Sequence, residues 1–279
     1  MGVSKRHDFD VAVIGAGPAG SSCAFGLAAR GFRVAVIEAR AFPRAKVCGE
    51  YISPAATALL EAMLSPADLQ RAGARREDTL VLEVGGREAR WTMPRPAWTL
   101  SRATLDDLLL RRAIGAGATA IQPAAVRGAA YFDDRAEVTL NDGRTISAGF
   151  VVHADGSGRF DPGGVIAHRA GFVGHKRHLK GVTIDGLRMR AAPGAYIGTV
   201  TVEGGRATCA LVARSALAKR FGGDLDAMLQ SLWPGYRREW GDGPWMSCPV
   251  PGAKYTPPGH ARSFRIGNAA AGVEPVGGE

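Results

Sequence analysis

Residues Asp10 to Glu38, DVAVIGAGPAGSSCAFGLAARGFRVAVIE, predict a strand, a glycine turn, a helix and a second strand that ends in an acid. Gly15, Gly17 and Gly20 fit the pattern G-x-G-x-x-G, in which glycines permit a tight turn, close approach of a pyrophosphate and close packing of the helix on the strand. Glu38 stands where a carboxylate can accept hydrogen bonds from ribose hydroxyls. We therefore predict a dinucleotide site, in preference to a βαβ turn with only a structural role.

The composition limits the classes of partner. A hydrophobic content of 46% in 279 residues is ordinary for a soluble globular protein with one large or two smaller domains. The formal net charge of +9 suits a phosphorylated cofactor or an acidic substrate, and no helix-turn-helix, zinc-finger or RNA-recognition pattern indicates a nucleic-acid partner. His175 and His178 lack a third ligand nearby, so no metal site is predicted.

The N-terminal residues MGVSKRHD lead directly into the first strand and show no signal peptide. Cys23, Cys48, Cys209 and Cys248 are widely spaced and form no C-x-x-C motif, which favours free thiols and a cytoplasmic location. The apolar stretch Val11–Ala29 could be taken for a membrane span, but its glycine turn argues against a transmembrane segment. Peripheral contact with a membrane surface stays open.

Hydrophobic spacing and turn residues predict the elements that follow. Gly85-Gly86 between two alternating stretches is a hairpin signal, and Asn141 to Gly143 is another. Helices are expected from Pro54 to about Leu64 with Ser53 as N-cap, from about 101 to 115, and from 224 to 232. Strands are expected at 79–84, 88–93, 119–121, 124–132, 136–140, 144–147, 150–153, 180–189, 195–202, 206–213 and 264–266. This order predicts an α/β fold, with a Rossmann-like domain and a second, β-rich domain.

Candidate site residues outside the glycine turn come from two loops. Cys48, Glu50 and Tyr51 lie together after the first βαβ unit and are candidates for a substrate pocket, although Cys48 could be only a small buried thiol. Asp155 and Gly156 follow a buried strand at the end where open α/β sheets bind ligands, although the aspartate could merely cap its own turn. Four aromatic residues either line an apolar pocket or pack in the core: Trp233, Tyr236, Trp240 and Trp245.

Four stretches together resemble the FAD-dependent oxidoreductases of the p-hydroxybenzoate hydroxylase superfamily. They are GAGPAG with Glu38, LSRATLDDLL at 100–109, VVHADGSG at 151–158 and IGNAAAGVEPVGGE at 266–279. The loop FPRAKVCGEYISP at 42–54 looks like the P-x-x-x-C-G loop of the geranylgeranyl reductase branch. The resemblance covers nearly the whole chain.

The resemblance implies a discontinuous FAD-binding domain in residues 1–80, 98–160 and 262–279, and a β-rich substrate domain in 81–97 and 161–261. It also implies NADPH or NADH as the reductant. Asn268 stands where the family has an aspartate, and an amide can still donate and accept hydrogen bonds. The residues implied to bind FAD are Gly15, Ala16, Gly17, Pro18, Ala19, Gly20, Glu38, Ala39, Arg102, Val126, Asp155, Gly156, Asn268, Pro275 and Gly277.

The function implied by the resemblance is reduction of a C=C bond in an isoprenoid or similar apolar small molecule, with electrons from NAD(P)H that pass through FAD. One alternative is an FAD-dependent monooxygenase that hydroxylates an aromatic or polyketide-like substrate. Because the sequence stops at Glu279 where a further helix would be expected, another alternative is a truncated, non-catalytic flavin-binding protein. A weaker alternative, based on the first motif alone, is an NAD-only dehydrogenase.

Overall fold

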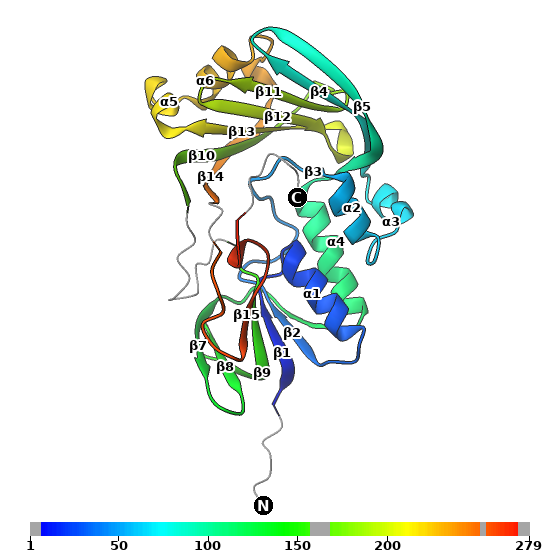
Figure 1. Cartoon of the computed structure of the whole chain (residues 1–279), viewed down its shortest axis with the longest axis vertical. Coiled ribbons are helices and arrows are strands. Elements are labelled where there is room, and N and C mark those ends of the chain that lie inside the picture. The colour runs from blue at the N-terminus through cyan, green and yellow to red at the C-terminus, as the bar shows by residue number, and fades with distance from the viewer. Residues whose placement is uncertain (1–6, 157–167, 252–254, 273–279) are drawn as a thin grey trace, which may run out of the picture. The chain divides into compact units, whose positions relative to one another are not determined.

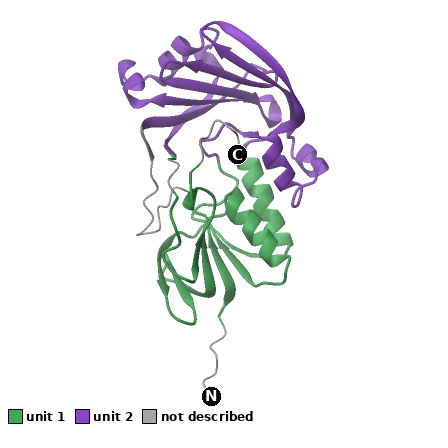
Figure 2. Cartoon of the chain, viewed as in Figure 1, with its two compact units in different colours: residues 1–44, 103–167, 251–273 green, residues 45–102, 168–250, 274–279 purple. Residues whose placement is uncertain are grey.

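The chain forms two compact units in the computed structural model, which describes residues 7–156, 168–251 and 255–272. Unit 1 comprises residues 1–44, 103–167 and 251–273, and unit 2 comprises residues 45–102, 168–250 and 274–279 (Figure 2). Among the described residues, no helix has both the length and the apolar character needed to cross a bilayer. Each unit is built on its own sheet.

Unit 1 contains a seven-stranded sheet in the order β6-β2-β1-β9-β8-β7, and β15 pairs with the C-terminal end of β9, on the edge that β8 uses further back (Figure 1). Strands β1, β2, β6, β9 and β15 are parallel, whereas β7 and β8 form an antiparallel extension of β9. Their bounds are β1 Phe9–Ile14, β2 Val34–Ile37, β6 Thr119–Ile121, β7 Val126–Tyr131, β8 Ala136–Leu140, β9 Thr145–His153 and β15 Ser263–Arg265. The predicted Rossmann-like βαβ unit is therefore confirmed.

Alternating residues of β1 supply the two cores of unit 1. Val11 and Val13 pack with side chains of α1 (Pro18–Ala28) and α4 (Arg102–Gly115), which cover one face of the sheet. Ala12 and Ile14 point to the opposite face and pack with β7, β8 and β9. A central parallel strand is buried on both faces, which explains why the sequence of β1 is continuously apolar at its end.

Unit 2 contains an eight-stranded sheet in the order β14-β10-β13-β12-β11-β4-β5-β3. The strands are β3 Tyr51–Ile52, β4 Arg75–Val84, β5 Arg87–Thr99, β10 His168–Leu179, β11 Leu187–Ala192, β12 Ala195–Thr201, β13 Ala207–Arg214 and β14 Gly241–Pro251. The helices are α2 Pro54–Leu60, α3 Pro66–Arg71, α5 Ser215–Arg220 and α6 Leu225–Leu232. Met228 and Leu229 of α6 pack on one face of the sheet, where they share a core with Ile197 and Leu211.

Most local predictions agree with these elements. The hairpin turn at Gly85-Gly86 joins β4 to β5, and the Ser53 side chain accepts a hydrogen bond from the Ala56 N–H, as expected of an N-cap. The helix that starts at Pro54 is shorter than predicted and ends at Leu60. The two short strands predicted at 144–147 and 150–153 are one continuous strand, β9.

The prediction of a strand over 180–189 is wrong for residues 180–186. Gly181 and Gly186 have φ of 68° and 69°, in the left-handed region, so the chain turns there and β11 begins only at Leu187. The strands β10 and β14 were not predicted, because neither shows a simple alternation of apolar and polar residues.

The compact units differ from the predicted domain boundaries at residues 45–80 and 98–102, which lie in unit 2, and at residues 251–261, which lie in unit 1. Strand β3 pairs with β5, and β4 pairs with both β5 and β11, so this part of the chain belongs to the second sheet. The division into an FAD-binding domain and a substrate domain stays a prediction.

Candidate cofactor-binding site

The glycine turn of unit 1 leaves no space for side chains at two of its positions. Gly15 has φ of 99°, and a Cβ atom there would lie 2.5 Å from the Ala154 carbonyl oxygen. A Cβ atom on Gly20 would lie 1.9 Å from the carbonyl oxygen of Gly15. The turn therefore depends on glycine for both its backbone conformation and its close packing.

The N-terminus of α1 is arranged for an anion. The helix begins at Pro18, its N-cap Gly17 offers no side-chain hydrogen bond, and its first turn contains no acidic residue. The amides of the first turn carry partial positive charge, and in this helix no carboxylate of its own neutralises it. These features fit a pyrophosphate, which is the group that such a turn binds in dinucleotide sites.

Glu38 lies directly after β2 and is only 5% exposed. Its Oε2 accepts a hydrogen bond from the Ala16 N–H at 3.1 Å, and its Oε1 accepts from the Arg40 N–H at 3.2 Å and the Arg44 guanidinium at 3.3 Å. The carboxylate thus joins the glycine turn to the loop after β2. Because a carboxylate can accept about four hydrogen bonds, capacity remains for a ribose hydroxyl.

Three strand ends meet around this turn within unit 1. The Ala154 N–H bonds the Ile14 carbonyl at 2.8 Å, so Asp155 and Gly156 follow β9 at the same edge as the glycine turn. Asn268 lies in the short helical turn after β15, and a Cβ atom on its neighbour Gly267 would lie 2.8 Å from the Cβ of Ala19. The structure therefore brings together sequence segments that are more than a hundred residues apart.

The remaining residues predicted to bind FAD lie elsewhere in the chain. Ala39 follows Glu38, and Val126 is the first residue of β7; Pro275 and Gly277 lie outside the described residues.

The three residues predicted to line a substrate pocket, Cys48, Glu50 and Tyr51, lie in unit 2. The Cys48 thiol is half-buried and accepts a hydrogen bond from the Glu50 N–H at 3.4 Å. Tyr51 is in β3 and donates its hydroxyl to the Met93 sulfur at 3.2 Å. The Glu50 side chain is fully buried and forms an internal carboxylate. The assignment of Cys48, Glu50 and Tyr51 to a substrate pocket stays a prediction.

Glu50 accepts hydrogen bonds on both oxygens. Its Oε1 accepts from the Lys176 ammonium and from the Arg102 N–H at 2.8 Å, and its Oε2 accepts from His178 Nε2 at 2.7 Å and Thr208 Oγ1 at 2.5 Å. Burial raises the pKa of Glu50, but the hydrogen bond from His178 and the charge of Lys176 outweigh it and lower the pKa to about 2. This buried group, which we call the Glu50 cluster (Glu50, Arg102 N–H, Lys176, His178 and Thr208), was not predicted from sequence.

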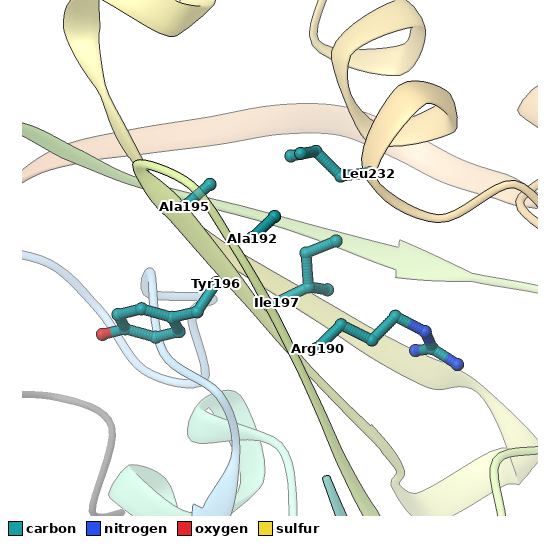
Figure 3. A pocket seen from close by; sticks show the side chains of 6 residues that line it. All are labelled: Arg190, Ala192, Ala195, Tyr196, Ile197 and Leu232. Carbon is teal, nitrogen blue, oxygen red and sulfur yellow. The ribbon is translucent and has the colours of Figure 1, made fainter. Parts of the chain in front are cut away.

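The four aromatic residues, for which the sequence left a pocket and core packing open, pack in or against the core of unit 2. Trp233 and Tyr236 are nearly buried, and their ring centroids lie 5.8 Å apart. The hollow drawn in Figure 3 has no room for a water molecule, so it is no substrate pocket. It is lined by Arg190, Ala192, Ala195, Tyr196, Ile197 and Leu232.

No metal centre is formed by the part of the chain that the structure describes, since no group of three or more His, Cys, Asp or Glu side chains is gathered for it. The four cysteines are free. The residues of unit 1 instead fit FAD: an uncapped helix N-terminus behind a glycine turn for the pyrophosphate, and a buried carboxylate at the end of β2 for the ribose.

Replacement of Glu38 by Gln tests this site. The carboxylate of Glu38 accepts hydrogen bonds from backbone N–H groups, and the NH₂ group of Gln would face one of these donors with a second donor. We therefore expect FAD affinity to fall about tenfold. The measurement is quenching of FAD fluorescence on titration with protein. Glu137→Gln, on β8 of the same unit, is the matched control and should leave the affinity unchanged. Equal affinities for all three proteins would contradict a role for Glu38.

Comparison with known proteins agrees with this geometry. Residues 9–184 match the family described as pyridine nucleotide-disulphide oxidoreductase. The chain is 31% identical to menaquinone reductase of Mycolicibacterium smegmatis over 97% of this chain and 72% of that protein. It is 34% identical to digeranylgeranylglycerophospholipid reductase 2 of Methanopyrus kandleri over 53% of this chain and 38% of that protein.

A solved structure shows the same fold. The flavin-dependent brominase Bmp2 superposes with a TM-score of 0.80 at 19% identity, over 96% of this chain and 73% of that one. The family match covers more than half of the chain and includes the glycine turn, Glu38 and Asp155. The chain therefore belongs to the pyridine nucleotide-disulphide oxidoreductase family and is an FAD-dependent oxidoreductase.

Proposed function

We propose that this protein reduces a C=C bond of an isoprenoid or similar apolar substrate, with NADPH or NADH as the source of electrons. The observation that carries this proposal is the likeness, over nearly the whole chain, to a relative that is named a reductase. A second relative is a reductase whose name specifies geranylgeranyl groups, and these are isoprenoid. The loop around Cys48, in which four residues separate Pro43 from Cys48-Gly49, resembles the loop of the same branch and supports it.

The sheet of unit 2 offers an apolar face that suits such a substrate. Successive side chains of a strand point to opposite faces of the sheet. Ile197 of β12 packs with α6, so Tyr196, Gly198 and Val200 lie on the opposite face. Figure 3 shows Tyr196 pointing away from Leu232, on the other side of the sheet from Ile197.

Neighbouring strands continue the same face. Met189 is in register with Gly198, and a Cβ atom on Gly198 would lie 3.2 Å from the Met189 sulfur. Tyr51, Leu80 and Met189 are partly buried and pack against the cluster of Leu187, Val200 and Val202. Flexible thioether and aromatic side chains are common where apolar ligands bind. The assignment of unit 2 as the substrate domain, and peripheral contact with a membrane that holds such substrates, belong to this proposal.

The roles proposed for the cofactor site follow from its geometry. The N–H groups at the start of α1 would hold the FAD pyrophosphate, Glu38 would accept from the ribose, and Asp155 and Asn268 would offer further hydrogen bonds at the same sheet edge. When bound, FAD supplies the capacity to pass a hydride from a nicotinamide to a substrate, and the protein supplies orientation and exclusion of water.

Oxygen dependence is the experiment that tests the reaction type. The FAD-loaded protein is incubated with NADPH or NADH and an isoprenoid quinone or isoprenoid lipid under argon, and the products are analysed by mass spectrometry. We expect product that has gained one H₂ per reduced bond without oxygen. Product that forms only in air, with oxygen consumed in proportion, would overturn the proposal and indicate a monooxygenase. Retained FAD without turnover in either atmosphere would indicate a flavin-binding protein that does not catalyse this reaction.

A further inference from the structure

Glu50 has an unusual backbone and an unusual set of partners. Among the described residues it is the one non-glycine residue with positive φ, at 58°. Its carboxylate accepts hydrogen bonds from three separate segments: from the backbone of the first residue of α4, from two side chains of β10 and from one side chain of β13. A left-handed conformation in a non-glycine residue is costly and persists where the surroundings fix it.

The same cluster closes the loop that carries Cys48. The Lys176 ammonium donates to the Glu50 carboxylate and also to the Lys46 carbonyl at 3.3 Å, so one buried cation binds both ends of residues 46–50. Cys48 lies between these ends, and its sulfur accepts the Glu50 N–H. Both side chains of the ion pair are buried, at 1% and 0% exposure.

We propose that Glu50 is a positioning residue that holds loop 46–50, and with it the Cys48 thiol, against β10. Through the N–H of Arg102 it also fixes the first residue of α4 relative to that loop. This inference does not depend on the identity of the substrate, because every contact that carries it lies within unit 2.

A purely stabilising role accounts less well for this arrangement. Buried ion pairs contribute little net stability compared with apolar side chains of the same size, because desolvation of both charges offsets their attraction. A carboxylate is, however, the side chain that can accept from four donors at once, and here two of these donors belong to the segments that need to be held, namely the Arg102 N–H and the ammonium that binds Lys46.

The rate at which Cys48 is alkylated tests the proposal. The background protein carries Cys23→Ser, Cys209→Ala and Cys248→Ser, so that Cys48 is its one thiol, and iodoacetamide is added well below the unfolding temperature. Glu50→Gln places an NH₂ group against two of the four donors, so we expect the loop to open and the alkylation rate to rise about tenfold or more. Far-ultraviolet circular dichroism checks that the variant is folded.

The control is Glu77→Gln. Glu77 is also buried in unit 2 and forms an ion pair with Arg75 at 3.4 Å, but it lies on β4. We expect Glu77→Gln to leave the reactivity of Cys48 unchanged. If Glu50→Gln and Glu77→Gln change the alkylation rate alike, or if neither changes it, Glu50 is not a positioning residue.

A second variant keeps the test decisive if Glu50→Gln does not fold. Glu50→Gln combined with Lys176→Gln removes both charges and leaves no uncompensated ion in the core. Increased alkylation of Cys48 in this folded double variant supports the proposal, and an unchanged rate overturns it. Since no substrate enters the assay, its outcome is independent of the reaction assigned to the protein.

Discussion

Gly20→Ala is expected to weaken FAD binding at least about 100-fold, which corresponds to about 2.7 kcal/mol. The added Cβ would lie 1.9 Å from the carbonyl oxygen of Gly15, in the turn that would cradle the pyrophosphate, and 3.1 Å from the Cβ of Ala154, which directly follows β9. Neither contact can be relieved by rotation of a flexible side chain, so α1 must move away from the turn. The measurement is the dissociation constant of FAD from fluorescence quenching.

Gly26→Ala is the matched control, on the same helix. A Cβ there would meet only the Arg30 guanidinium at 3.6 Å, an ordinary contact. Alanine is the better helix former, so we expect the free energy of unfolding to rise by about 0.5–1 kcal/mol with unchanged FAD affinity. Undiminished FAD affinity in Gly20→Ala would contradict the placement of the pyrophosphate at this turn.

Lys176→Met is expected to lower the free energy of unfolding by about 3–5 kcal/mol near neutral pH. The substitution keeps the apolar volume but leaves the Glu50 carboxylate buried without its ammonium partner, and an uncompensated buried charge is strongly destabilising. Urea unfolding followed by circular dichroism measures the loss. Lys180→Met, at an exposed position directly after β10, should change the stability by less than about 0.5 kcal/mol.

The loss of stability caused by Lys176→Met is expected to depend on pH. The pKa of Glu50 is lowered from 4.5 to about 2 in the folded protein, so its contribution of about 3 kcal/mol is complete above pH 4.5 and is lost as the pH falls through 2. Without Lys176 the pKa of Glu50 rises, and the carboxyl group is protonated at higher pH. The difference in stability between the two proteins should therefore shrink on acidification. A constant difference at all pH values would contradict the ion pair.

The cofactor-binding part of the molecule could be predicted from sequence because its signals are local. The glycine turn and Glu38 follow one another within 29 residues, and β1, α1 and β2 form where the pattern places them. The prediction of a strand over 180–189 failed for residues 180–186 because Gly181 and Gly186 turn the chain inside a stretch that otherwise alternates polar and apolar residues. A glycine in a strand pattern has several structural meanings, and only the tertiary fold decides among them.

The Glu50 cluster could not be predicted, and the reason is sequence distance. Lys176 is 126 residues from Glu50, His178 is 128 and Thr208 is 158. On their own strands these residues read as a polar face open to solvent. The one local signal was the Cys48-Gly49-Glu50 loop, which favoured a substrate pocket and did not indicate that Glu50 is a buried carboxylate with partners on distant strands.

The simplest test of FAD dependence is the visible absorption spectrum of the purified 279-residue protein after incubation with FAD and desalting. We expect flavin absorption bands to be retained in proportion to the protein, and to bleach when NADPH or NADH is added under argon. A protein that is folded by circular dichroism, yet loses all flavin on desalting and is not bleached by either nicotinamide, would contradict the assignment of this chain as an FAD-dependent oxidoreductase.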